Sequence, residues 1–274
     1  MIRSVAATGP TFRILRYGRA MTARSAPTPE ISIVVPVFNE AGAVETLALE
    51  ISTAFAGWRH EMVFVDDASG DDTRARLTAL SGRLPGLRVM GHRRNAGQSR
   101  AIRTGVLAAR APLVVTLDGD GQNAPADAPR LAAALRDAGP EVAMIAGERR
   151  KRQDSQAKKW ASRVANGVRR RMLRDKAADT GCGLKAFRRE AFLALPYFDH
   201  LHRYLPALML REGFEVRFEP VGHRPRESGQ SKYTNLGRLG VALFDLAGVM
   251  WLNARARPTG GVEEATLPAP PERA

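Results

Sequence analysis

The chain has 274 residues, of which 44% are hydrophobic and 26% are charged, and its formal net charge is +14. This is the composition of an ordinary globular protein, with room for one large α/β domain or for two domains. The one cysteine, Cys182, excludes an internal disulfide and indicates a reducing compartment.

The basic residues gather in two segments. Residues 1–28 carry five arginines and no acid, and residues 149–176 carry twelve Lys or Arg residues against two acids. Such clustering favours an anionic partner, which can be a membrane surface, a phosphate or a nucleic acid. Residues 1–28 lack the apolar core of a secretory signal, so we expect a disordered basic extension; a transit peptide and a start at Met21 are the alternatives.

From residue 30 onward, short apolar runs alternate with segments of helical composition. The runs predict strands at Ile31–Val35, Met62–Val65, Leu87–Met90, Leu113–Leu117 and Val142–Ala146. The segments between them predict helices at Ala43–Phe55, Asp71–Leu80, Gly97–Ala109 and Ala128–Ala138. Strands that alternate with helices in this way predict an α/β fold with a mostly parallel central sheet flanked by helices.

The rhythm changes after Gly147. Gln156–Arg174 is a basic amphipathic segment with an apolar residue at every fourth position, so it is either an interfacial helix on anionic lipid or a surface helix packed on the sheet. The apolar stretch Leu239–Leu252 contains Asp245 and spans only ~21 Å, less than the ~30 Å of a hydrocarbon core. We therefore expect a membrane-associating helix, or one docked on the domain, there.

Polar groups follow each of the first four predicted strands. Because the ends of parallel strands meet at one edge of a sheet, these groups are expected to form one site. The strand Leu113–Leu117 leads directly into Asp118, Asp120 and Gln122, whose oxygens suit Mg²⁺ or Mn²⁺ together with the phosphates of a substrate. Asp67 is suited to a base or a ribose hydroxyl, and Gly97 opens a helix whose N–H groups can approach phosphate.

An ordered set of motifs resembles that of the family 2 glycosyltransferases. Within that family, the set most resembles the polyprenyl-phosphate glycosyltransferases, which include the dolichol-phosphate mannosyltransferase group. The first four motifs are Val35–Glu40, Val65–Thr73, Arg94–Gly97 and Asp118–Gln122. The later four are Gly147–Arg149, Asp179–Phe187, His202–Leu208 and His223–Tyr233. The metal motif departs from the family's more frequent pattern, because Gly119-Asp120-Gly121 replaces Ala-Asp-Leu; this predicts a more flexible loop with the same ligand atoms.

The resemblance implies a Rossmann-like, A-type glycosyltransferase fold, a GDP- or UDP-linked sugar donor and a polyprenyl phosphate acceptor, dolichol or undecaprenyl phosphate. It divides the chain into the extension at 1–28, a catalytic domain at 29–233, an apolar juxtamembrane helix at 234–256 and a disordered tail at 257–274. It implies a peripheral or monotopic protein at the cytoplasmic face of a bacterial membrane, with an anionic membrane surface and no nucleic acid as partner. Since a phosphate acceptor is already an anion, we expect direct displacement with inversion and little help from a general base.

The resemblance also assigns residues to roles. Those implied for the nucleotide are Pro36, Phe38, Glu40, Asp67, Asn95 and Gly97. Those implied near the acceptor phosphate are Arg149, Lys158, Ser162, Ser231 and Lys232. The stretch Gly229–Lys232, which contains the last two, would also close over the donor phosphates. The catalytic set is Asp118, Asp120, Arg149 and Arg226.

Four alternatives remain. One is a family 2 enzyme that acts on a sugar hydroxyl in polysaccharide or glycolipid synthesis, which would need a carboxylate base near the acceptor. A nucleic-acid-binding protein would use the net charge of +14, but aromatic residues make up only 6% of the chain and provide few stacking platforms. The others are a different nucleotide-binding α/β protein, although no P-loop run occurs, and a catalytically inactive relative.

Overall fold

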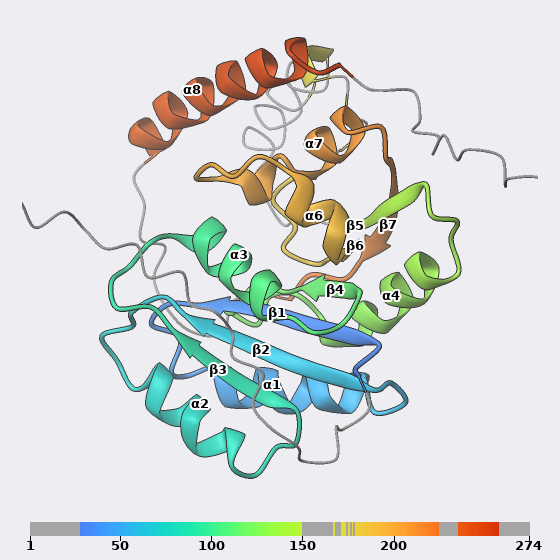
Figure 1. Cartoon of the computed structure of the whole chain (residues 1–274). Coiled ribbons are helices and arrows are strands. Elements are labelled where there is room, and N and C mark those ends of the chain that lie inside the picture. The colour runs from blue at the N-terminus through green and yellow to red at the C-terminus, as the bar shows by residue number, and fades with distance from the viewer. Residues whose placement is uncertain are drawn as a thin grey trace, which may run out of the picture.

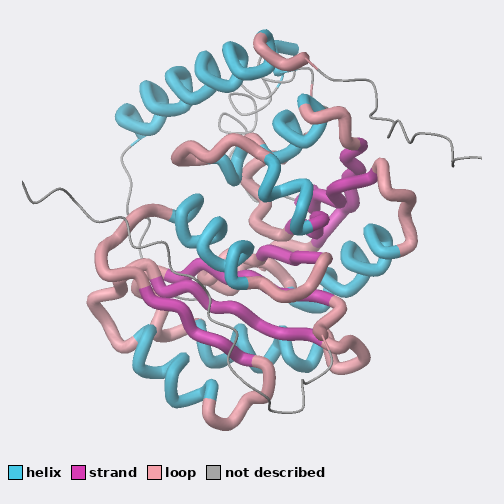
Figure 2. Tube along the Cα trace, viewed as in Figure 1, coloured by secondary structure: helices cyan, strands magenta, loops and turns pink. Residues whose placement is uncertain are grey.

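The computed structural model describes residues 28–149, 167, 171–173, 175, 177, 179–224 and 235–257, and of residues 235–239 it describes the backbone only. These residues form one seven-stranded sheet with helices on both faces (Figures 1 and 2). The strands are β1 (Ile31–Val37), β2 (His60–Asp66), β3 (Leu87–Gly91), β4 (Leu113–Thr116), β5 (Val142–Arg149), β6 (Lys185–Arg188) and β7 (Glu215–Val221). The helices are α1 (Val44–Ala54), α2 (Thr73–Ser81), α3 (Gln98–Ala108), α4 (Ala128–Arg136), α6 (Arg189–Ala194), α7 (Leu205–Arg211) and α8 (Asn235–Ala254), with short 3-10 turns η1 (Pro125–Asp127) and η2 (Leu201–Arg203).

The strand order is β3-β2-β1-β4-β6-β5-β7. The first four strands along this order pair in parallel, as do β5 and β7, while β6 runs antiparallel to both of its neighbours. The prediction of an α/β fold with a mostly parallel sheet is therefore confirmed. Because β1, β2, β3 and β4 are parallel, the four loops that follow them leave the sheet at the same edge.

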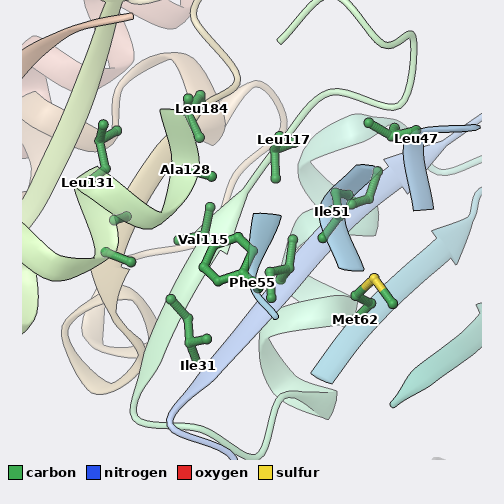
Figure 3. Close-up of a cluster of buried hydrophobic side chains, with 14 of the residues drawn as sticks. Ile31, Leu47, Ile51, Phe55, Met62, Val115, Leu117, Ala128, Leu131 and Leu184 are labelled. Carbon is green, nitrogen blue, oxygen red and sulfur yellow. The ribbon is translucent and has the colours of Figure 1, made fainter. Parts of the chain in front are cut away.

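One face of the sheet packs against α1, α2 and α4. Its core contains Ile31 and Ile33 from β1, Ile51 from α1 and Leu131 from α4, all fully buried, and Figure 3 shows side chains of this core around Phe55. β1 is apolar at successive positions and not only at alternate ones, because its other face is covered as well.

The opposite face carries α3, α6, α7 and, farthest from the sheet, α8 (Figure 1). Here Val34 of β1 and Val114 of β4 pack with Phe187, Phe192 and Val249, all fully buried. α3 presents Gly105 to the sheet, where an added methyl group would overlap Val34. The close approach of α3 to β1 fixes the position of its first residues beside the strand ends.

The expected elements of the first half agree with the structure to within a few residues at each end. The elements β6, α6, α7 and β7 were not predicted. β6 is only four residues long and α6 only six, too short for a periodic pattern to distinguish them from loops. Most of the basic segment Gln156–Arg174, residues 1–27 and residues 258–274 lie outside the described residues, so the expectations for them stay predictions.

Candidate active site

Hydrogen bonds join the loops that follow β1 and β2. The Asn39 N–H donates to Ser69 Oγ over 2.9 Å, and the Asn39 side-chain oxygen accepts from the Gly70 N–H over 2.7 Å. Asn39 has a φ of 54°, which an Asn tolerates better than most residues. The pairing fixes the course of the loop on which Phe38, 36% exposed, and the half-buried Glu40 are placed.

Asp67 joins the second loop to the third. Its Oδ2 accepts from the Gly97 N–H over 2.8 Å, and its Oδ1 accepts from the Ala96 N–H over 2.9 Å and lies 2.6 Å from His92 Nδ1. Asn95 Nδ2 donates to the Asp67 carbonyl over 3.2 Å. Gly97 opens the helix whose N–H groups we expected to approach phosphate, and its own N–H is already bonded to a buried carboxylate. Its role at a phosphate stays a prediction.

The loop from Asp118 to Asn123 is held by its own side chains. The Asp118 N–H donates to Asn123 Oδ1 over 2.8 Å, and the Gln122 N–H donates to Asp120 Oδ1 over 3.1 Å. Gln98, the first residue of α3, donates from Nε2 to Asp118 Oδ1 over 2.8 Å. Asp118 and Asp120 are both partly exposed at the edge where the four loops meet.

Each glycine between these ligand positions has a structural reason. A methyl group added at Gly119 would lie 2.6 Å from the Pro36 carbonyl oxygen and 2.6 Å from Val37 Cγ1, so the loop presses against the end of β1. Gly121 has a φ of 73°, in the left-handed region that favours glycine. The expectation of a flexible loop is therefore replaced by one of tight packing at Gly119 and a required turn at Gly121.

A second backbone segment packs directly behind Asp118. A methyl group added at Gly183 would overlap the Asp118 carboxylate, and Thr116 Oγ1 of β4 donates to the Gly183 carbonyl over 2.8 Å. Lys185 Nζ donates to the carbonyl of the neighbouring Cys182. The motif Asp179–Phe187 thus supports the acidic loop from the antiparallel strand β6.

Arg149, at the end of β5, is paired with Asp179. Its Nε and Nη2 donate to the two carboxylate oxygens over 2.5 Å and 2.7 Å, and both side chains are nearly buried. The bidentate geometry fixes the plane of the guanidinium. Hydrogen bonding to Asp179 raises the pKa of Arg149, so this side chain is a permanent cation.

The surroundings of Asp118 disfavour its ionised form. Burial, followed by the charge of Asp120, raises the pKa of Asp118 to about 6, against the opposing charges of Lys185 and Arg149. A divalent cation held by both acids would relieve the repulsion between them. The donor set of two carboxylates and the Gln122 amide oxygen consists of hard oxygen ligands, which fit Mg²⁺ or Mn²⁺. Within the ranges that the structure describes, no group of three or more His, Cys, Asp and Glu side chains is clustered for a metal.

Not every expected site residue can be located. Arg149 lies on the same side of the sheet end as Asp118, whose charge contributes to its raised pKa. The other expected residues near the phosphates, Lys158, Ser162, Arg226, Ser231 and Lys232, lie outside the described residues.

The sequence interpretation gave no role to four residues that the structure brings into the site. Gln98 contacts Asp118, and His92 contacts Asp67. Asp179 pairs with Arg149, and Gly183 packs against Asp118. Asp179 and Gly183 were quoted within a motif, and that was the available signal. His92 and Gln98 carried no signal, because their partners are 25 and 20 residues away in the chain.

Comparisons with known proteins agree with this arrangement. The sequence profile of "Glycosyl transferase family 2" matches residues 32–195. The chain is 34% identical over 236 residues to a dodecaprenyl-phosphate galacturonate synthase of Rhizobium johnstonii, covering 84% of this chain and 69% of the relative. It is 35% identical over 223 residues to an undecaprenyl-phosphate 4-deoxy-4-formamido-L-arabinose transferase of Edwardsiella ictaluri, covering 79% of this chain and 66% of the relative. The chain thus spans about two thirds of the length of these curated relatives.

Among solved structures, the fold is similar to that of a glucosyl-3-phosphoglycerate synthase from Mycobacterium tuberculosis, crystallised with Mn²⁺, UDP and glucosyl-3-phosphoglycerate. The TM-score is 0.61 at 18% identity, covering 85% of this chain and 82% of that chain. The same enzyme was also crystallised with Mg²⁺ and UDP, with a TM-score of 0.60 at 17% identity and the same coverage of both chains. At these identities the likeness establishes the A-type glycosyltransferase fold.

Proposed function

The chain belongs to glycosyl transferase family 2, and from that premise we propose that it transfers a sugar from a GDP- or UDP-linked donor to a polyprenyl phosphate, with inversion. The observation that carries the proposal is the placement of Asp118 and Asp120 where four parallel strand ends meet, in a chain 34% identical to a dodecaprenyl-phosphate galacturonate synthase. Open α/β sheets bind their ligands at this edge. Dolichol and undecaprenyl phosphate are the polyprenyl phosphates that we propose as acceptors.

The donor would lie across the four loops. The residues assigned to the nucleotide are Pro36, Phe38, Glu40, Asp67, Asn95 and Gly97, all of which lie on the first three loops or at the end of β1. Asp67 already accepts bonds from the third loop and contacts His92, so it orders the nucleotide-binding surface, and its Oδ2 keeps a lone pair for a base or hydroxyl donor. Asp118, Asp120 and Gln122 would hold Mg²⁺ or Mn²⁺ beside the diphosphate. The bound ion would supply charge stabilisation to the departing nucleoside diphosphate.

The acceptor needs cations more than it needs a base. A phosphate monoester is an anion near neutral pH, so its oxygen can attack the anomeric carbon directly. It must approach a donor that is also anionic, and positioned cations lower that repulsion. We assign this role to Arg149, because its ion pair with Asp179 uses Nε and Nη2 and leaves Nη1 outside that pair. Lys158, Ser162, Arg226, Ser231 and Lys232 are assigned to the phosphates on the resemblance alone.

The proposed partner at the outer side is an anionic membrane. Among the described residues, no helix is both long and apolar enough to cross a bilayer. α8 nevertheless exposes an apolar face that we call the α8 outer face: Val241, Leu243, Phe244, Met250 and Trp251 are 45%, 59%, 82%, 36% and 61% exposed. Its acid, Asp245, points the other way and pairs with His200 Nδ1 over 2.8 Å. A helix with its apolar residues outward and its acid inward suits the boundary of a lipid layer. We place the protein at the cytoplasmic face of a bacterial membrane, as a peripheral or monotopic protein.

The test is a transfer assay. Purified protein, Mn²⁺ and a set of labelled GDP- and UDP-sugars are incubated with undecaprenyl phosphate or with oligosaccharide acceptors, and lipid-linked and oligosaccharide products are separated. We expect label in the lipid fraction with at least one donor. Asp120→Ala should abolish transfer, whereas Asp137→Ala, which removes an exposed acid at the end of α4, should leave it unchanged.

Two results would contradict the proposal. Undiminished transfer by Asp120→Ala would reject the metal assignment, and label found only in the oligosaccharide fraction would favour a hydroxyl acceptor.

Arg149→Ala should weaken use of the acceptor more than binding of the donor. Because that change removes the ion-pair partner of Asp179, Asp179→Asn is measured beside it to separate loss of the cation from loss of the ion pair.

A further inference from the structure

Lys185 is a buried cation behind the acidic loop, and no step of the proposed transfer uses it. It is the first residue of β6, where it stands opposite Thr116 of β4 and is only 3% exposed. Its Nζ donates to the carbonyl of Cys182. A charged amine is rarely buried unless its surroundings compensate it, so its presence here calls for a function.

Two neighbouring side chains hold two consecutive carbonyls. Lys185 holds the carbonyl of Cys182, and Thr116 holds that of Gly183 over 2.8 Å. Gly183 is the residue whose backbone packs against the Asp118 carboxylate, so closely that a methyl group would overlap it. The position of that carboxylate is therefore limited from behind by a backbone segment, and Lys185 and Thr116 prevent the segment from withdrawing.

The charges around Lys185 come from several elements. Burial lowers the pKa of Lys185. Cys182, Asp118 and Asp179 favour its charged form, and Arg149 opposes it. His202, of η2, is also near: its pKa is held well below the ordinary value by burial first and by Lys185 next, so it is neutral. Among the described residues, Lys185 and Arg149 are the cations whose charges act on Asp118.

We propose that Lys185 is a positioning residue of the metal site: by holding the Cys182 carbonyl, it keeps Gly183 against Asp118 and presents that carboxylate in one orientation to the cation. This inference rests on the proposed function, since it assumes that Asp118 is a metal ligand. Residues that orient metal ligands contribute about tenfold or more to metal affinity.

The experiment measures Mn²⁺ binding by electron paramagnetic resonance, with UDP or GDP in excess, and thermal unfolding in EDTA. Lys185→Met keeps the length of the side chain and removes the charge and the donor. We expect the Kd for Mn²⁺ to rise about tenfold or more. We also expect the Tm in EDTA to fall, because the Cys182 carbonyl loses its donor and the nearby acids lose a compensating charge. Lys185→Arg should restore part of the affinity.

Arg188→Met is the matched control. Arg188 lies at the other end of β6 and also donates to main-chain carbonyls, those of Val142, Ala138 and Gly139. Its loss should also lower the Tm but leave the Kd for Mn²⁺ within about twofold, so that metal affinity, and not stability, separates the two variants. If Lys185→Met does not fold, Thr116→Val tests the same segment through the Gly183 carbonyl and should also weaken Mn²⁺ binding.

The outcomes are distinguishable. If the wild-type protein binds Mn²⁺ and Lys185→Met, or Thr116→Val in its place, binds it equally well, the inference is overturned and the proposed function stands. If the wild-type protein binds no Mn²⁺ with either nucleotide, the metal site itself is rejected and the inference falls with it. Equal losses of affinity in Lys185→Met and Arg188→Met would show a general loss of structure and would also overturn it.

Discussion

Asp118 illustrates how a single residue can be positioned for binding at the expense of folding. Its carboxylate is confined by Gly183 behind it and by Gln98 beside it, and it lies near a second acid. Burial and Asp120 raise its pKa from the ordinary 3.8 to about 6. A carboxyl whose pKa is raised by folding destabilises the metal-free protein at every pH where it must be ionised.

The sign of the pH dependence follows from this shift. Between the ordinary value of 3.8 and about 6, the folded state binds more protons than the unfolded state, so stability falls as the pH rises through that window. Asp118→Asn removes the ionisation. At pH 7.5 in EDTA, we expect this variant to be more stable than the wild-type protein by on the order of 1–2 kcal/mol.

The advantage of Asp118→Asn should shrink as the pH falls towards 4, because the wild-type carboxyl is then protonated as well. The measurement is the Tm of both proteins in EDTA across this range, with Asp137→Asn as a control for an exposed acid. An equal or lower Tm for Asp118→Asn at every pH would show that Asp118 is not destabilised by its surroundings. Transfer activity should be lost in the same variant, so stability and function change in opposite directions.

At the scale of elements, α8 differs from an ordinary surface helix because its outward face is apolar as well as its inward one. Its inward face packs Val249 and Leu252 on the domain and pairs Asp245 with His200, while the α8 outer face is apolar. Arg255, in the turn after α8, places its guanidinium 5.9 Å from the ring centroid of Trp251. An aromatic ring beside a cation at the end of an apolar stripe suits the interface between lipid chains and headgroups.

The α8 outer face provides the prediction at this scale. Phe244→Glu replaces the most exposed apolar side chain of that face, so it should leave the Tm unchanged and weaken binding to vesicles that contain anionic phosphatidylglycerol by about tenfold. Vesicle sedimentation measures this. Leu107→Glu is the matched control, because Leu107 is a 51%-exposed apolar residue on α3. If both variants bind vesicles as the wild-type protein does, α8 is not the docking element.

At the scale of the whole molecule, the sheet gathers distant parts of the chain into one binding edge. Asp67 connects the second loop to the third, Asn39 connects the first to the second, and Gln98 connects α3 to the acidic loop. These connections leave few independent movements to the donor-binding loops. Donor binding should therefore stabilise the fold as a unit.

Ligand binding should be visible in global stability. A ligand that binds only the folded state stabilises it by ~2.7 kcal/mol at one hundred times its Kd, which corresponds to about 5–10 °C for a domain of this size. We expect Mn²⁺ together with the correct nucleotide sugar to produce such a shift, and EDTA to abolish it. The measurement is a thermal-shift screen over GDP- and UDP-sugars. No shift with any donor would contradict the proposed donor class.

Much of the fold could be predicted because its signals are local. The first five strands are mostly apolar runs and the helices between them are amphipathic, so each could be identified within a window of about a dozen residues. β6 could not, since it has only four residues and owes its place to pairing with β4 and β5. Of the site, the acidic loop was visible as a motif, whereas Gln98 was not, because its contact with Asp118 depends on how α3 packs on the sheet.

By itself, the amino-acid sequence determined the fold class, the family resemblance and the identity of the acids at the fourth strand, because apolar periodicity and short motifs are properties of neighbouring residues. Only the tertiary structure decided which groups surround those acids. Gly183 packs against Asp118, and Gly97 donates to Asp67, although each pair is 30 or more positions apart in the chain. Lys185 is buried by residues of other elements. The physical reason is that burial and hydrogen-bond partners are set by packing, which no local pattern contains.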